Sequence, residues 1–271
     1  MISVSDCTSL INQFLPEPHA GLLSGIVFGT KAALSYELKQ ALVTTGTLHI
    51  VALSGMNITI ITALVHNTML RLFPRRIGYG VTIFIIVGFI LFVGPSSSVV
   101  RAGVMGGITI LGVITGRQRI PLYIWGLAVA GMLITKPSWI GELSFQLSAL
   151  ASLGMIIFGS AKRPVEQKHS FLSSLWAFVS DDLHTTLAAQ VFTIPLIFFT
   201  FHRISLIAPI TNVLIGWTIQ IITILGICMV IVGFVWFPLG QICAWISWIF
   251  LQYIIMVIMW TSTIPMASVG W

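Results

Sequence analysis

Long apolar runs alternate with short polar, proline- or glycine-containing breaks along most of this chain. A membrane-spanning helix needs about 20 mostly apolar residues, and a backbone in lipid must satisfy its own hydrogen bonds. The pattern therefore predicts an all-α, polytopic integral membrane helical bundle with about seven to nine transmembrane or re-entrant helices. The predicted spans are 47–70, 78–93, 99–115, 122–135, 143–158, 183–201, 204–237 and 239–263.

Three positions modify this pattern. Pro195 is expected to kink the helix over 183–201, and Pro209 to divide the long run over 204–237. Residues 171–179 are too few to span and are predicted to be re-entrant or interfacial. A solvated loop at the entrance of the next span is predicted for Asp181, Asp182 and His184.

The first 46 residues have a different character. Residues 21–29 are apolar but too short to span, and 31–42 alternate charged and apolar groups as a surface helix does. We expect residues 1–46 to form an extracytoplasmic or interfacial N-terminal segment. Residues 47–265 are expected to form the transmembrane domain.

Cationic residues orient the predicted spans. They gather after the first, third and fifth spans, as Arg71, Arg75, Arg76, then Arg117 and Arg119, then Lys162, Arg163 and Lys168. The positive-inside rule makes these loops cytoplasmic and places both termini on the extracytoplasmic side of the plasma membrane.

Composition excludes an ordinary soluble domain. The chain is 57% hydrophobic and 7% charged, with a mean hydropathy of +1.03, whereas soluble domains carry roughly 25% charged residues. The net charge of +6 is explained mostly by the orienting loops. No cofactor, metal site or ATP motor is expected, since neither a phosphate loop nor metal-ligand spacing is present and the three cysteines suit apolar packing.

Residues 47–57 contain the first group of polar side chains in a span. On one continuous helix Thr47, Ser54 and Asn57 would lie within about a quarter of the circumference, with His49 on another flank. Two interpretations stay open: a polar stripe that lines a pathway, or interhelical hydrogen bonds contributing about 0.6 kcal/mol each.

Arg101 lies about one turn inside an apolar helix, after a Gly-Pro-Ser-Ser-Ser stretch over 94–98. One interpretation is that the side chain snorkels to the interface. The other is a fixed positive charge at a pore mouth, which attracts phosphate or pairs with Glu142.

A carboxylate, an amide and hydroxyls open the run over 142–158. Glu142 and Gln146 share one helix face, while Ser144, Ser148 and Ser152 follow each other at every fourth position. Glu142 can also cap the helix start. Gln190 and Asn212 are further amides near prolines, and polar groups in lipid usually face a bundle interior or a wet cavity.

These segments, in this order, resemble the competence domain of the ComEC/Rec2 family of DNA-uptake proteins. The residues that carry the resemblance are Leu15-Pro16, 21–25 and Gly29, then 45–55, Pro95-Ser96, Arg101-Ala102, 142–149, Gln190, Pro195 and Asn212. One departure is Asn57, where many relatives have a histidine, so that a proton-relay role at this position is in doubt.

The resemblance implies an inner-membrane channel subunit that passes single-stranded DNA into the cytoplasm during natural transformation. It implies a channel-lining or DNA-path role for His49, Ser54, Asn57, Arg101, Gln146, Gln190 and Asn212, and a structural polar role for Glu142, Ser144 and Ser148. Family members often carry an oligonucleotide-binding-like domain and a metallo-β-lactamase-like nuclease domain. This chain contains neither, so no nuclease activity is expected of it.

The implied partners are single-stranded DNA and the lipid bilayer, separate nuclease and oligonucleotide-binding subunits, a cytoplasmic helicase-like motor and further copies of the chain. Three alternatives stay open. A small-solute or ion transporter often has inverted repeats, which we do not find here. An intramembrane serine hydrolase would need a base beside Ser54, for which His66, His184 and His202 are available. An assembly scaffold would tolerate changes at the polar positions.

Overall fold

The computed structural model of the chain describes residues 3–30, 34–51, 53–116, 118, 120–159, 171–201, 203–264 and 268–270. These residues form helices and one short antiparallel ribbon, in which β1 (Arg203–Ser205) pairs with β2 (Ser268–Gly270). The α-helices are α1 (Val4–Phe14), α2 (His19–Phe28), α3 (Tyr36–Thr44), α4 (Leu48–Val51), α5 (Gly55–Leu72), α6 (Arg75–Val93), α7 (Ser97–Ile114), α8 (Pro121–Thr135), α9 (Leu143–Phe158), α10 (Phe171–Phe201), α11 (Ala208–Val235) and α12 (Phe237–Ser262). A 3-10 helix, η1 (Pro137–Gly141), precedes α9.

Among the described residues, five helices are long and apolar enough to cross a membrane: α6, α7, the part of α10 over Leu183–Thr200, α11 and α12. Three shorter apolar helices are α2, α8 and α9. These helices confirm the predicted fold class, a helical membrane protein.

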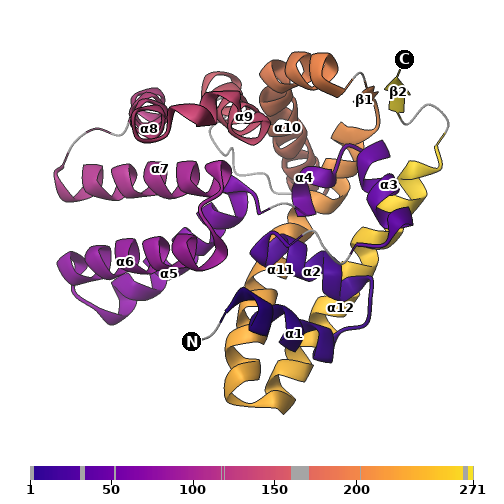
Figure 1. The fold of residues 1–271 in the computed structure, drawn as a ribbon, viewed down its shortest axis with the longest axis horizontal. Coiled ribbons are helices and arrows are strands. Elements are labelled where there is room, and N and C mark those ends of the chain that lie inside the picture. Colours follow the sequence, from indigo (N-terminus) through magenta and orange to yellow (C-terminus); the bar gives the residue numbers. More distant parts are fainter. Residues whose placement is uncertain are drawn as a thin grey trace.

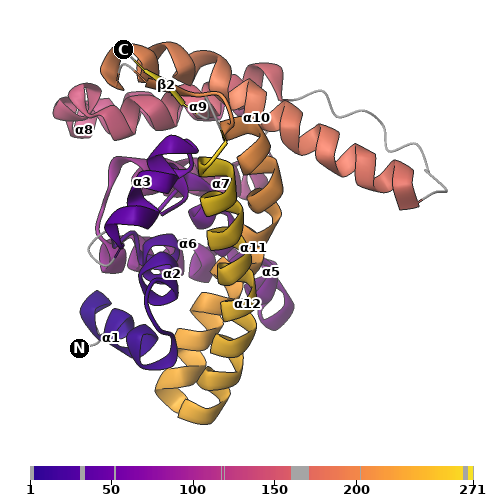
Figure 2. The ribbon, with the colours of Figure 1, turned by 90° about the vertical axis from the view of Figure 1, so that its right-hand side faces the viewer.

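Helices α11 and α12 run alongside one another as a long hairpin (Figures 1 and 2). Its two helices meet closely near their connection, where glycines remove side-chain bulk. A Cβ on Gly240 would lie 2.7 Å from the Cα of Gly233 and 2.7 Å from Cζ of Phe14. The ring of Phe14 at the end of α1 therefore fills the space that the two glycines leave open.

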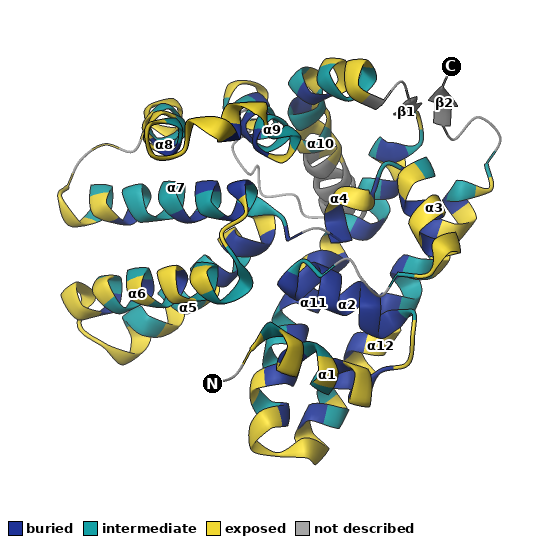
Figure 3. Ribbon diagram, in the orientation of Figure 1, coloured by how far each residue is buried: buried dark blue, intermediate teal, exposed yellow. Residues whose placement is uncertain are grey.

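Helix α2 is enclosed by other helices. All ten of its residues are buried, and it packs against α11, α12, α1 and α4 (Figure 3). A helix that is apolar on every face needs such surroundings. The main core accordingly joins residues far apart in the chain, among them Leu22, Leu23, Ile26, Ile219, Ile222, Leu251 and Ile254. The N-terminal segment over 1–46 thus shares a core with the last two helices, and its side of the membrane stays a prediction.

A second group of helices lies beside this core. α5, α6 and α7 run alongside one another, and α8 and α9 cover α7 (Figure 1). α9 also packs against α10 at a close backbone crossing, where a Cβ on Gly154 would clash with the carbonyl oxygen of Ala188.

The structure corrects the predicted span over 47–70. α4 ends at Val51 and α5 begins at Gly55, with Ser54 extended between them at φ −92° and ψ 159°. The break arises because the Ser54 hydroxyl caps α5 by accepting a hydrogen bond from the amide of Asn57 at 3.3 Å. Thr47, Ser54 and Asn57 therefore do not lie on one helix.

Two further predictions were wrong. Residues 171–179 belong to the continuous helix α10, which also contains Pro195, so they are not a separate re-entrant piece. Asp181, Asp182 and His184 consequently lie within helical backbone rather than in a loop. Pro209 occupies the first turn of α11, where a proline needs no amide hydrogen bond, so the predicted break falls just before it. The predicted loop cations Arg117, Arg119, Lys162, Arg163 and Lys168 lie outside the described residues, as does His202.

Candidate functional site

Arg101 lies near the start of α7 and its guanidinium is buried. The residue is only 7% exposed, and Nη1 donates a hydrogen bond to the Ser152 hydroxyl at 2.7 Å. Ser152 itself donates within α9, to the carbonyl oxygens of Ser148 and Ala149. The contact therefore links α7 to α9 and holds the arginine inside the helix cluster, whereas a snorkelling side chain would extend to its surface.

The other side of the guanidinium faces the first residue of α5. A Cβ on Gly55 would lie 2.8 Å from Nη2 of Arg101 and 3.6 Å from the Cβ of Ala102. Only a residue without a side chain lets the guanidinium come this close to the backbone. Nε of Arg101 is buried and has no acceptor in the part of the chain that the structure describes.

Glu142 does not pair with Arg101, which corrects that hypothesis. Its Oε1 lies 3.8 Å from Nζ of Lys136, the one ion pair among the described residues. The 3-10 turn η1 brings Lys136 back beside the start of α9, and its Nζ also lies 5.3 Å from the ring centroid of Trp139. Both partners are about half exposed, so the pair contributes about 0–1 kcal/mol. Glu142 occupies the N-cap position of α9 without a side-chain capping bond.

A polar pocket lies where α7 and α9 begin. The hydroxyls of Ser98 and Ser144 share a hydrogen bond at 3.1 Å. The pocket has a volume of about 200 Å³ and is lined by Phe28, Gly29, Leu53, Val93, Gly94, Ser96, Ser98 and Ser144. Sequence reasoning assigned Ser144 a structural role and did not single out Ser96 or Ser98 as lining residues. The run of three serines after Pro95 was the available signal.

Asn57 connects α5 to α2. It is fully buried, and its Nδ2 donates to the carbonyl oxygen of Ile26 at 2.8 Å. Ile26 lies in the last turn of α2, where carbonyl groups have no partner within the helix. Asn57 thus makes an interhelical hydrogen bond, the second of the two interpretations, while its Oδ1 has no donor among the described residues.

The remaining predicted lining residues make local contacts or lie on other helices. His49 is exposed, and its Nδ1 donates to the carbonyl oxygen of Gly46 at 3.0 Å. Gln146 donates to the carbonyl oxygen of Ile140 in η1 at 2.7 Å. Gln190 on α10 and Asn212 on α11 are partly buried, and Oδ1 of Asn212 has no donor within the described residues.

The structure thus brings Arg101 and Ser152 together beside Gly55, the residue that follows Ser54. The seven predicted lining residues do not appear among the described residues that line the polar pocket. Their shared path stays a prediction.

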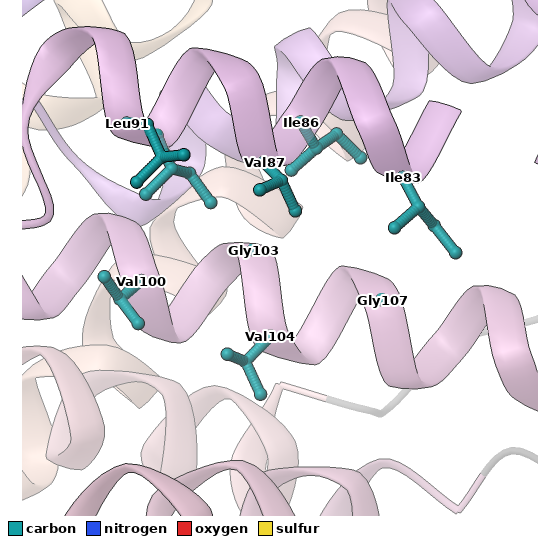
Figure 4. Close-up of a pocket in the computed structure, with 9 residues that line it drawn as sticks. Ile83, Ile86, Val87, Leu91, Val100, Gly103, Val104 and Gly107 are labelled. Atoms are coloured by element: carbon teal, nitrogen blue, oxygen red, sulfur yellow. The ribbon is translucent and has the colours of Figure 1, made fainter. Parts of the chain in front are cut away.

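A second pocket, between α6 and α7, is apolar (Figure 4). It measures about 320 Å³ and is lined by Ile83, Ile86, Val87, Ile90, Leu91, Val100, Gly103, Val104 and Gly107. Gly103 packs closely against the side chain of Ile90, whereas Gly107 has open space beside it. Aliphatic walls suit hydrocarbon and cannot carry a charged strand.

A metal centre needs a cluster of ligands, and a serine hydrolase needs a base beside Ser54. No group of three or more His, Cys, Asp or Glu side chains that could hold a metal occurs within the described residues. The Ser54 hydroxyl bonds to the Asn57 amide, and no described histidine makes a hydrogen bond to it. His66 instead stacks on Tyr79, with ring centroids 5.4 Å apart.

Comparisons with known proteins show which family this chain resembles. The family model described as "Competence protein" matches residues 26–271. ComE operon protein 3 of Bacillus subtilis (strain 168) is 26% identical over 208 residues, which cover 76% of this chain and 25% of that protein. The chain therefore spans about a quarter of the length of this relative. No solved structure matches the chain.

Proposed function

Because the chain belongs to the competence protein family, we propose that it acts in DNA uptake during transformation. Its role there is that of a membrane channel subunit through which single-stranded DNA passes into the cytoplasm. The relative named for the ComE operon supports the assignment to DNA uptake over the 208 aligned residues.

One observation carries the channel proposal: a buried guanidinium, with no carboxylate partner among the described residues, lies in the same helix cluster as a pocket that three serines help to line. A DNA strand brings one negative charge for every nucleotide, and such charges need polar walls and positive potential to pass through a membrane. Arg101 supplies the potential. Ser96, Ser98 and Ser144 supply polar groups at the starts of α7 and α9.

The proposal extends to the membrane arrangement. The five long helices, together with α5, α8 and α9, would supply eight elements in the plasma membrane, within the proposed range of seven to nine transmembrane or re-entrant helices. The positive-inside rule supports an extracytoplasmic position for both termini. The lining residues of the path are proposed to be His49, Ser54, Asn57, Arg101, Gln146, Gln190 and Asn212.

The proposed partners follow from the task of moving a charged polymer. A separate nuclease subunit would degrade the second strand. An oligonucleotide-binding subunit would deliver the DNA, and a cytoplasmic helicase-like motor would draw it inward. Further copies of the chain would enlarge the path.

The test of the channel is genetic. Arg101→Ala and Gln146→Leu are expected to abolish DNA uptake while the protein still inserts into the membrane at the normal level. Arg71→Gln is the matched control, because Arg71 is exposed at the opposite end of α5. Normal transformation by both of the first two variants would remove the lining hypothesis.

A further inference from the structure

The guanidinium of Arg101 lies in an electrostatically unfavourable place. It follows the first turn of α7, and its Nη2 points at the first residue of α5. Each helix start carries roughly half a positive charge from the aligned peptide dipoles, which favours anions and disfavours cations. A positive side chain therefore faces the positive ends of two helices of 18 residues each.

No described carboxylate compensates this charge. The single ion pair among the described residues joins Lys136 to Glu142, and the neutral hydroxyl of Ser152 is the sole described acceptor for Arg101. The residue is 7% exposed, and its Nε has no acceptor among the described residues. A buried cation is costly without a counter-charge and hydrogen bonds.

The first turn of α5 offers hydrogen-bond donors beside the guanidinium. The backbone amide of Asn57 donates a hydrogen bond to the Ser54 hydroxyl. The backbone amides of Gly55 and Met56 have no acceptor among the described residues. Gly55 has no side chain to cover this turn, and Met56 is 45% exposed. An anion that contacts both the guanidinium and these amides would receive charge-assisted hydrogen bonds from both.

We infer that Arg101 and the first turn of α5 at Gly55 form a binding subsite for one phosphodiester group of a single-stranded nucleic acid. This inference rests on the proposed function, which supplies the strand. Ser152 is the positioning residue, because its hydroxyl holds Nη1, while Nη2 lies beside Gly55 and Nε has no acceptor among the described residues. The subsite recognises the charge of a phosphate group and makes no contact with a base, so it would bind a strand of any sequence.

The subsite can be tested on the full chain in phosphatidylcholine nanodiscs, with a fluorescent oligothymidylate as the probe. Arg101→Gln should weaken binding by roughly tenfold or more, as expected for loss of a charge-assisted contact. It should also lower the slope of log affinity against log salt by about 0.7, the value for one phosphate contact on a single strand. Gly55→Ala should weaken binding too, because its methyl group would crowd the guanidinium and cover the helix start while Arg101 keeps its charge.

Three controls make the result specific. Arg71→Gln should keep the wild-type affinity and salt slope. An oligothymidylate with an uncharged methylphosphonate backbone should bind wild type and Arg101→Gln equally. Thermal melting of each variant should stay near that of the wild type. If Arg101→Gln does not fold, Gly55→Ala and Arg101→Lys give the readout, the latter keeping the salt slope but losing affinity.

Several outcomes would overturn the inference. Wild-type affinity and slope in both Arg101→Gln and Gly55→Ala would show that the strand binds elsewhere. An equal loss in Arg71→Gln would indicate general attraction to surface charge. Displacement of the oligonucleotide in nanodiscs that contain phosphatidylglycerol, with Arg101-dependent binding of that lipid, would identify a headgroup site.

The same variants separate this subsite from the channel itself. If oligonucleotide affinity is independent of Arg101 while Gln146→Leu still abolishes transformation, the subsite is wrong and the channel stands. If both Arg101→Ala and Gln146→Leu transform normally, the proposed channel lining fails, whatever the affinity measured in nanodiscs.

Discussion

The hydroxyl of Ser152 accepts a hydrogen bond from Nη1 of Arg101 at 2.7 Å, and this contact fixes the guanidinium of α7 against α9. A buried arginine with one neutral acceptor depends on that acceptor for its position. Ser152 therefore fixes the position of the Arg101 guanidinium. Ser148 lies one turn earlier on α9.

Ser152→Ala should destabilise the protein by about 2 kcal/mol, because a hydrogen bond to a charged group is lost in a buried place. The measurement is the midpoint of thermal unfolding in detergent. Ser148→Ala is the matched control: its hydroxyl makes no hydrogen bond among the described residues, so its midpoint should stay within error of the wild type. Equal midpoints for the two variants would contradict the role given to Ser152.

Gly55→Ala should leave stability nearly unchanged but reduce transformation. A methyl group would come within 2.8 Å of Nη2 of Arg101, whose flexible side chain can move away. Alanine also gains up to about 1 kcal/mol in helix propensity over glycine. Gly88→Ala on α6 is the control, since a Cβ there meets nothing within 4 Å. Transformation efficiency at matched protein levels decides, and wild-type efficiency in Gly55→Ala would count against a functional role for this approach.

Gly154→Ala should disrupt the crossing of α9 and α10. The added Cβ would clash with the backbone carbonyl oxygen of Ala188, which cannot rotate away as a side chain can. Overpacking of this kind costs roughly 1–3 kcal/mol. We expect a lower unfolding midpoint and less protein in the membrane, whereas Gly131→Ala on α8, with open space around it, should behave as wild type.

Asn57→Leu should loosen α2 from α5. The change leaves the buried carbonyl oxygen of Ile26 without a donor, at a cost of about 1–3 kcal/mol. Hydrogen exchange of the α2 amides measures the effect, and faster exchange is expected. Asn67→Leu provides the comparison, because Asn67 is exposed on the same helix. Unchanged α2 protection in Asn57→Leu would show that the hydrogen bond is dispensable.

Cysteines at Ser98 and Ser144 should form a disulfide on mild oxidation, since the two hydroxyl oxygens lie 3.1 Å apart. The double variant is made in a chain whose three native cysteines are replaced by alanine. Oxidation should reduce transformation by tying α7 to α9 across the polar pocket, and dithiothreitol should restore it. Full activity of the cross-linked protein would exclude movement of these two helix starts during uptake.

Element boundaries could be predicted where apolar runs end at proline or glycine. α9 was predicted at its observed bounds, and α6, α7, α8 and α12 within a few residues. The break in the predicted helix at Ser54 was missed, because a serine that caps a helix inside an apolar run cannot be told from a serine within one continuous helix. The continuity of α10 through Asp181 and Asp182 was missed for the opposite reason, since two charges in succession resemble a loop.

Partners of the polar residues were harder to predict than the elements. Arg101 and Glu142 have opposite charges and lie near the same predicted face of the membrane. The 3-10 helix η1 nevertheless places Glu142 beside Lys136, and the two form an ion pair. Ser152 was recognised only as part of a stripe, because no spacing within one helix reveals which arginine of another helix it meets. The burial of α2 also depends on contacts with residues late in the chain, so local periodicity could not reveal it.

The enclosure of α2 sets an order for biogenesis. The ribosome releases this helix early, whereas α11 and α12, which cover it, are synthesised last. Until then the faces of α2 that pack on α11 and α12 stay uncovered, so the bilayer surface or a chaperone must shelter them. Nascent chains that stop before Ala208 should therefore be cleared by membrane proteases, which makes completion of the C-terminal hairpin a checkpoint for the whole subunit.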